Sequence, residues 1–237
     1  MYKLSLFIHN INILLIYIMN IPVGVSLGWN CNPAIKGIAH NLRKSKEDGY
    51  LTMPFDLGVT NLKGIVHCLQ DDFKDFTNSE CLQLIEYNKE LSPVKLDHMQ
   101  PNESLLVNTK YNFYFNHESP GHGDLYKSQK WEEGINHYVN NDYLHFKNKY
   151  NRRIQHFKNL LNADNITIMF LLEGYSTNNK YVNDLKCVLN NKYPSLKYEL
   201  RFFEIGDKDQ YKNIMKQTYS LFVNDDEFMN YMDNDDF

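Results

Sequence analysis

The sequence predicts an α/β domain with a mixed, largely parallel sheet flanked by helices and a β-hairpin near residues 104–117. Three observations favour this class. Short apolar runs alternate with segments of helical periodicity, as in proteins with parallel sheets. Two strand-like segments flank a short polar turn, which is typical of a hairpin. The length of 237 residues, of which 43% are hydrophobic, suffices for one sizeable core, so we expect a single domain over residues 21–222.

The first predicted element is a short buried strand over residues 23–27, followed by a turn at Gly28 and a helix over residues 32–43. Cys31 therefore lies at or just before the N-terminus of a helix. Unpaired backbone N–H groups and the helix dipole favour negative charge there, so we expect the Cys31 thiolate to be stabilised relative to the thiol.

The next elements are a second helix and the hairpin. Thr60 can cap a helix whose apolar residues are Leu62, Ile65, Val66 and Leu69. After a polar loop, strands over 104–107 and 111–115 form the hairpin, and the second strand ends at Asn116-His117-Glu118.

The second half of the chain continues the α/β alternation. A long helix begins near Asp142 and keeps its apolar residues on one face up to Leu161. A continuous apolar run over 166–172 predicts a buried strand. It is followed by a helix around 182–189, a strand over 197–205 and a last helix near 211–219. This order predicts parallel strands.

The first twenty residues resemble a signal peptide or a membrane anchor, because residues 4–19 are mostly apolar behind Lys3. Polar residues interrupt the run, which is short for a spanning helix and lacks a small-residue cleavage site. We therefore favour Met19 as the natural start, so that the part of the 1–20 segment before Met19 is upstream sequence, over the alternative of an apolar leader. Membrane contact is expected only if this segment is a true anchor.

Charge and cysteine content exclude several classes of function. The net charge of −4, the pI near 6.1 and the dispersed Lys and Arg residues argue against nucleic-acid binding. Four cysteines without a CxxC pair argue against a disulfide scaffold and predict a cytoplasmic protein, in the host cytoplasm if the chain is viral. Cys68, Cys81 and Cys187 are expected in the core, and residues 223–237 form an acidic tail.

Several motifs together resemble one family. They are Ser26-Leu27-Gly28-x-x-Cys31, Pro54-Phe55-Asp56, an aromatic strand ending in His117, and Tyr150-x-Arg152-Arg153-Ile154 before an apolar strand. In this order they resemble the papain-like cysteine peptidases known as a domain of unknown function in bacteria and large DNA viruses. The resemblance runs from about Val23 to about Gly206.

The resemblance implies a catalytic Cys31 with His117 as its base, acting on a peptide or protein substrate. The chain departs from the family pattern at two places. It has Glu118 where the family has an Asp after the histidine, and Leu171, Leu172 and Glu173 where the family has an Arg shortly after the apolar strand. The second departure weakens any anion-binding role at that position.

The chain supplies the groups that a thiol nucleophile requires. Asp56 or Glu118 would orient the imidazole of His117, and Asp56 is favoured because it lies in the rigid Pro-Phe-Asp turn. The side chain of Asn30 and the backbone N–H of Cys31 would bind the oxyanion. The candidate substrate-contacting residues are Trp29, Gly28 and Glu118.

Other interpretations use the same residues. Cys31 can be a packing residue, and His117 a strand-end histidine bonded to a backbone carbonyl. The alternative function is a non-catalytic α/β module that binds an anionic ligand, a nucleotide-sugar or glycan, at the 28–31 turn. His117, His122 and Asp124 match no metal motif, so no metal or other cofactor is expected.

Overall fold

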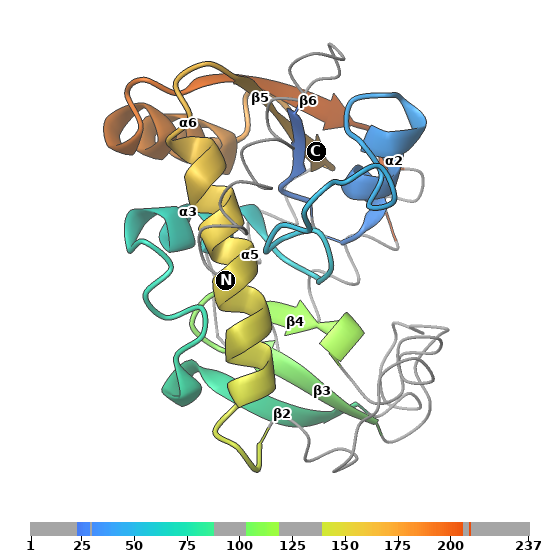
Figure 1. Ribbon diagram of the computed structural model, residues 1–237, viewed down its shortest axis with the longest axis vertical. Helices are drawn as coiled ribbons and strands as arrows, with labels where there is room; N and C mark the ends of the chain where they lie inside the picture. The colour runs from blue at the N-terminus through green and yellow to red at the C-terminus, as the bar shows by residue number, and fades with distance from the viewer. Residues whose placement is uncertain (1–22, 29, 88–102, 119–138, 206–208, 210–237) are drawn as a thin grey trace.

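Two three-stranded β-sheets organise the chain (Figure 1). The computed structural model describes residues 23–28, 30–87, 103–118, 139–205 and 209. One sheet is parallel and the other antiparallel, with helices packed around them, so the predicted mixed α/β class with a hairpin is confirmed. The structure adds that the hairpin strands build a sheet of their own.

The parallel sheet has the strand order β1-β5-β6. Strand β1 (Val23–Ser26) pairs with the central strand β5 (Thr167–Glu173), which pairs along its whole length with β6 (Lys197–Phe203). Helix α6 (Lys180–Lys192) connects β5 to β6. All three strands therefore end at one carboxyl edge.

The antiparallel sheet has the order β2-β3-β4, formed by Leu82–Tyr87, Glu103–Asn108 and Phe113–Phe115. Strands β3 and β4 are the predicted hairpin. Strand β2 differs from the sequence prediction, which places a polar loop over this segment. A single 3-10 turn, η2 (Asn116–Glu118), follows β4 and carries His117.

Helices cover both faces of the parallel sheet. Helix α2 (Asn32–Ala39) lies on one face, where a Cβ at Gly37 would be only 2.4 Å from Cδ1 of Leu171. The side chains of Phe170 and Leu172 point to the other face and join the main core. Helices α3 (Leu62–Gln70), α5 (Leu144–Leu161) and α6 contribute to that core.

Aromatic side chains fill the core between the two sheets. Phe55 is fully buried at its centre, with ring centroids of neighbouring phenylalanines 5.6–6.1 Å away. These neighbours come from the segment after α3, from β4 and from α5: Phe73, Phe76, Phe113 and Phe157. Phe55 thus holds several elements together, since three of these pairs are edge-on and the pair with Phe73 is stacked, and both arrangements add to the gain from burial.

Residues 59–62, here called the connecting segment, link the two sheets. Val59 exchanges backbone hydrogen bonds of 2.8 and 2.9 Å with Tyr114 of β4. Thr60 Oγ1 donates to the carbonyl oxygen of Gly28, just after β1. The Leu62 N–H donates over 3.1 Å to the hydroxyl of Tyr175, beyond the end of β5.

Asn61, and not Thr60 as predicted, caps helix α3. Its Oδ1 accepts the N–H of Gly64 at 2.7 Å, while its Nδ2 donates to the carbonyls of Tyr111 and Asn112 at 2.9 and 3.1 Å. The Thr60 hydroxyl is already used by Gly28. The buried side chain of Asn61 therefore provides hydrogen-bond partners both for an N–H group at the start of α3 and for two carbonyl groups in the turn before β4.

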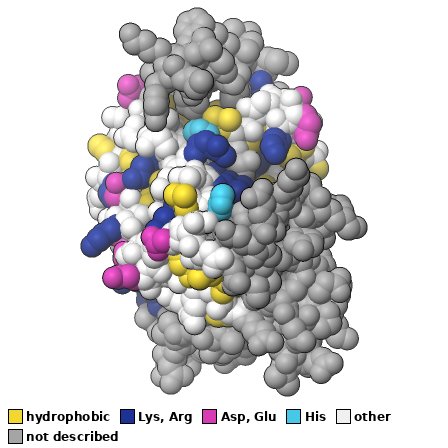
Figure 2. Space-filling model, turned by 60° about the horizontal axis from the view of Figure 1, so that its bottom comes forward, with side chains coloured by type: hydrophobic (Ala, Val, Ile, Leu, Met, Phe, Trp, Pro, Cys, Tyr) yellow, Lys and Arg dark blue, Asp and Glu magenta, His cyan; other side chains and the backbone are white. Residues whose placement is uncertain are grey.

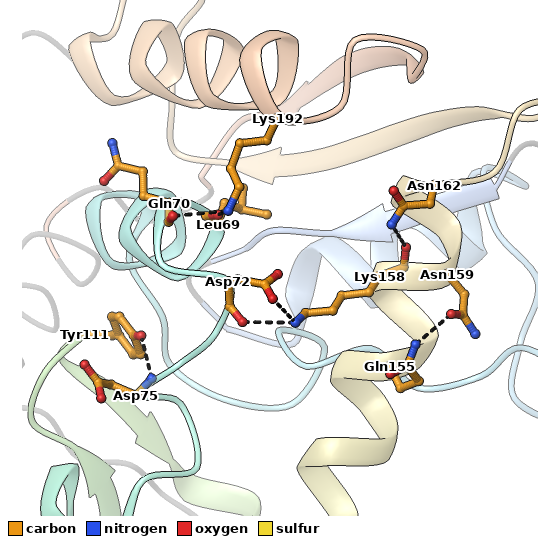
Figure 3. A network of polar contacts seen from close by, with 10 residues as sticks. All are labelled: Leu69, Gln70, Asp72, Asp75, Tyr111, Gln155, Lys158, Asn159, Asn162 and Lys192. Carbon is orange, nitrogen blue, oxygen red and sulfur yellow. Dashed lines mark hydrogen bonds and ion pairs between the residues drawn. The ribbon is translucent and has the colours of Figure 1, made fainter.

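Two lysines hold the C-terminal end of α3 and the turn that follows it, as Figure 3 shows. Lys192 of α6 donates to the carbonyls of Leu69 and Gln70 at 2.6 and 3.1 Å, which satisfies the C-terminal end of α3. Lys158 of α5 contacts the carbonyl and the carboxylate of Asp72 at 3.0 and 2.7 Å. Asp72 has a left-handed backbone with φ of 60°, so these bonds stabilise a strained turn.

Some predicted features differ in the structure. The first helix ends at Ala39 instead of residue 43, because the chain turns at Asn41, whose φ is 56°. Cys68 is buried as expected, whereas Cys81 is half-buried in a 3-10 turn and Cys187 is exposed on the outer face of α6. The prediction of three core cysteines is thus wrong for two of them.

Three predicted segments lie outside the described residues: the apolar stretch 1–20, the last helix near 211–219 and the acidic tail 223–237. Among the described helices, none combines the length and the apolar character needed to cross a lipid bilayer.

We expect replacement of Asn61 by Ala to lower the free energy of unfolding by about 3 kcal/mol, because a helix cap and donors to two buried carbonyls are lost. Urea unfolding followed by circular dichroism measures the change. The control is Asn78→Ala, which removes a more exposed cap. A similar loss in both variants would show that Asn61 acts only as a cap.

Candidate active site

Cys31 is the N-cap residue of α2 and lies at the carboxyl edge of the parallel sheet. Its predicted position at the start of a helix is therefore confirmed. The helices that follow the neighbouring strands β1 and β5 cover opposite faces, as described above for Leu171 and Phe170. In open α/β sheets, this reversal marks the crevice in which ligands bind.

The turn that presents Cys31 is held by close packing and by two hydrogen bonds to Gly28. A Cβ at Gly28 would lie 2.1 Å from Cγ of Pro33, so only glycine fits at this position. The Gly28 N–H donates over 3.2 Å to Oγ of Ser26, and its carbonyl accepts the Thr60 hydroxyl. Both hydroxyls belong to buried side chains. The turn is thus fixed from β1 and from the connecting segment.

Asn30, a predicted oxyanion donor, lies directly before Cys31. Its Oδ1 accepts the N–H of Asn32 at 2.7 Å, in the first turn of α2. This bond uses the side-chain carbonyl and leaves the NH₂ group as the part of Asn30 that suits an oxyanion.

The electrostatics at Cys31 differ from the expected stabilisation of the thiolate. Burial raises the pKa of the Cys31 thiol above its ordinary value, a hydrogen bond from its own backbone N–H lowers it by less, and the negative charge of Glu173 raises it again. The expected stabilisation of the thiolate is therefore not found, because burial and the Glu173 carboxylate together raise the pKa by more than the backbone hydrogen bond lowers it.

Glu173 is a residue of this site that sequence reasoning missed as a functional candidate. Its side chain is 2% exposed at the carboxyl end of β5 and forms an ion pair with Lys36 of α2. Lys36 also donates to the carbonyl of Glu204, after β6, at 2.8 Å. The sequence does contain a signal that could have identified Glu173, namely a charged residue at the end of a continuous apolar strand.

His117 lies in η2 and is half-buried. It follows Tyr114 by three residues, and Cys31 follows Gly28 by three residues. Tyr114 is bonded to Val59 and Gly28 to Thr60, which are adjacent in the connecting segment. The segments that lead into Cys31 and into His117 are therefore hydrogen-bonded to two adjacent residues, Thr60 and Val59.

Asp56 is engaged elsewhere in the fold. Its carboxylate is 2% exposed, lies 2.8 Å from Nη1 of Arg43 and accepts the N–H of Met53 at 2.8 Å. The Arg43 guanidinium in turn lies 3.7 Å over the ring of Tyr50. This buried pair fixes the Pro-Phe-Asp turn, and a role of Asp56 in orienting His117 stays a prediction.

Glu118 is also buried, at 1% exposure, and pairs with cations of helix α5. Its carboxylate lies 2.6 Å from Nζ of Lys149 and 3.8 Å from Nη1 of Arg153. These contacts fix η2 against α5, and the role predicted for Glu118 in the site is untested.

The remaining predicted residues fall outside the description. Trp29, His122 and Asp124 are not among the described residues. Within the part of the chain that is described, no group of three or more His, Cys, Asp and Glu side chains is arranged to hold a metal ion.

The surface around the described elements carries mixed charge. Figure 2 shows Lys and Arg side chains near the middle of one face, beside histidine side chains, with acidic side chains toward both edges of the described surface. Hydrophobic side chains on the described part of this face occur in small separate areas. Charged groups of both signs would therefore meet a partner that approaches this face.

The fold and the site define an α/β protein with a cysteine presented at the carboxyl edge of a parallel sheet. The family model described as "Putative papain-like cysteine peptidase (DUF1796)" matches residues 23–203, and the chain belongs to this family. The resemblance stated from the motifs is thereby confirmed. Neither a curated protein nor a solved structure matches the chain significantly.

We expect Glu173→Gln to lower the pKa of Cys31, because it removes a negative charge that raises this pKa and leaves the positive charge of Lys36 in place. Alkylation of Cys31 by iodoacetamide would then begin at lower pH than in the wild type. Peptide mass spectrometry across a pH series measures this shift.

The matched control is Glu204→Gln, which makes the same charge change at an exposed position whose backbone, not its carboxylate, binds Lys36. Equal pH profiles for the two variants would contradict a specific effect of Glu173.

Proposed function

We propose that this protein is a cysteine hydrolase or acyl transferase that acts on an amide, isopeptide or thioester, with Cys31 as nucleophile and His117 as base. The observation that carries the proposal is the position of Cys31 at the sheet's carboxyl edge, linked through Thr60 and Val59 to the strand that leads to His117. Membership of a family described as papain-like cysteine peptidases supports the same chemistry.

In the proposed reaction, His117 takes the proton of the Cys31 thiol as the sulfur attacks the substrate carbonyl carbon. The bond from carbon to the leaving nitrogen of an amide or isopeptide, or to the leaving sulfur of a thioester, then breaks, and the leaving group takes the proton from His117. Water in a hydrolase, or an acceptor amine or thiol in a transferase, attacks the acyl-thioenzyme and restores the thiol.

The raised pKa of Cys31 favours removal of the proton during attack over a thiolate formed in advance. In such a mechanism the base matters more than the helix dipole, so the rate should depend strongly on His117. The developing oxyanion would be bound by the Asn30 amide and the Cys31 N–H.

The alternative, an anion-binding module at the 28–31 turn, is less well supported. The Glu173 carboxylate acts electrostatically on Cys31 and would repel an anion there. One backbone donor at the start of α2, the N–H of Asn32, already binds Asn30. A turn that binds anions needs such donors directed at the ligand.

The proposal can be tested with p-nitrophenyl acetate, which donates an acetyl group to a reactive thiol. We expect acetylation of Cys31 with release of nitrophenolate, and a fall of about a hundredfold in this rate in His117→Ala, because base-assisted attack is lost. Mass spectrometry of peptides from the acid-quenched protein quantifies acetylation at each cysteine.

The protein contains its own controls. Cys187 is exposed and reports the ordinary reactivity of a thiol, while fully buried Cys68 becomes labelled only if the fold opens. Cys31→Ala must abolish the His117-dependent release of nitrophenolate. Acetylation of Cys31 no faster than that of Cys187, and unchanged in His117→Ala, would reject the enzyme.

A further inference from the structure

We propose that Thr60 is a positioning residue, which holds the Cys31 turn in register with strand β4, the strand that leads to His117. This inference rests on the proposed function and deepens it. Thr60 is not adjacent in sequence to either residue, and the predicted role as a helix cap belongs to Asn61 instead.

The contacts of the connecting segment alternate between the two halves of the site. Val59 bonds to β4 through both its N–H and its carbonyl. Thr60 turns its hydroxyl to Gly28, and Asn61 turns back to the carbonyls before β4. Thr60 therefore supplies the side-chain bond to the Cys31 turn, between two residues fixed to the hairpin.

The surroundings of Thr60 are closely packed. Thr60 is 1% exposed, and Gly28 packs so closely against Pro33 of α2 that a displaced turn would carry the start of α2, and with it Cys31, in the same direction. Loss of the hydroxyl would leave the buried Gly28 carbonyl without this donor. The turn would then move relative to Val59 and β4, and with it the thiol relative to the imidazole.

A valine at position 60 keeps the shape of threonine and removes only the donor. We expect Thr60→Val to slow acetylation of Cys31 by p-nitrophenyl acetate about tenfold to a hundredfold relative to Cys187, the range that small misplacements of reacting groups produce. Thr60→Ser keeps the hydroxyl and should restore most of the rate.

Thr109→Val is the matched control, because the Thr109 hydroxyl also donates to a backbone carbonyl, that of Cys81, at 3.3 Å but outside the site. It should leave the rate unchanged. The decisive measurement repeats Thr60→Val in the His117→Ala background. If Thr60 acts by placing the thiol near this imidazole, its loss should have little further effect once the imidazole is absent.

Each other outcome overturns the inference. If acetylation of Cys31 is slow in His117→Ala but has the wild-type rate in Thr60→Val, the proposed function stands and the role of Thr60 is rejected. Equal slowing by Thr60→Val in both backgrounds would show an effect that does not pass through His117. No effect of His117→Ala would reject the function and this inference together. Thr60→Ala serves as a second variant that lacks the hydroxyl. Acetylation of buried Cys68 in both Thr60→Val and Thr60→Ala would show that the fold opens, and that Thr60 contributes to general stability instead of positioning the thiol.

Discussion

The hydrogen bonds of residues 59–62 are the constraint on which the candidate site depends. The parallel sheet presents Cys31 and the antiparallel sheet leads to His117, and these sheets are formed by distant parts of the chain. The connecting segment binds the end of β1 and strand β4 through adjacent residues. Any chemistry shared by the two halves requires this joint to be rigid.

Buried ion pairs fix the elements that carry the candidate residues. Arg43 with Asp56, Lys36 with Glu173, and Lys149 with Glu118 each pair a buried carboxylate with a cation from another element. Breaking one member of such a pair leaves a buried charge without compensation, which is strongly destabilising. One of these carboxylates, Glu173, also opposes ionisation of Cys31. The resting protein therefore favours the neutral thiol.

Local periodicity was sufficient to predict much of the fold. The strand before Cys31, the long helix α5 and the strands β5 and β6 have patterns that their own residues determine. Strand β2 was missed because its assignment depends on pairing with β3. The predicted cap of α3 is one residue too early. Thr60 and Asn61 are both residue types that cap helices, and only the hydrogen bond of Thr60 to Gly28, which the sequence does not reveal, shows that Asn61 is the cap.

The place of Cys31 at the start of a helix was predictable from the sequence, but the electrostatics around its thiol were not. The start of α2 could be located from sequence, whereas the pairing of Lys36 with Glu173 joins residues far apart in the chain and required the structure.

The most direct test of the account is a cross-link between Cys31 and His117. The short bifunctional reagent 1,3-dibromoacetone alkylates a thiol first and then a nucleophile beside it. We predict a single bridge from the sulfur of Cys31 to the imidazole of His117, identified by tandem mass spectrometry. Alkylation of Cys31 without a bridge, or a bridge to a different residue, would contradict the account.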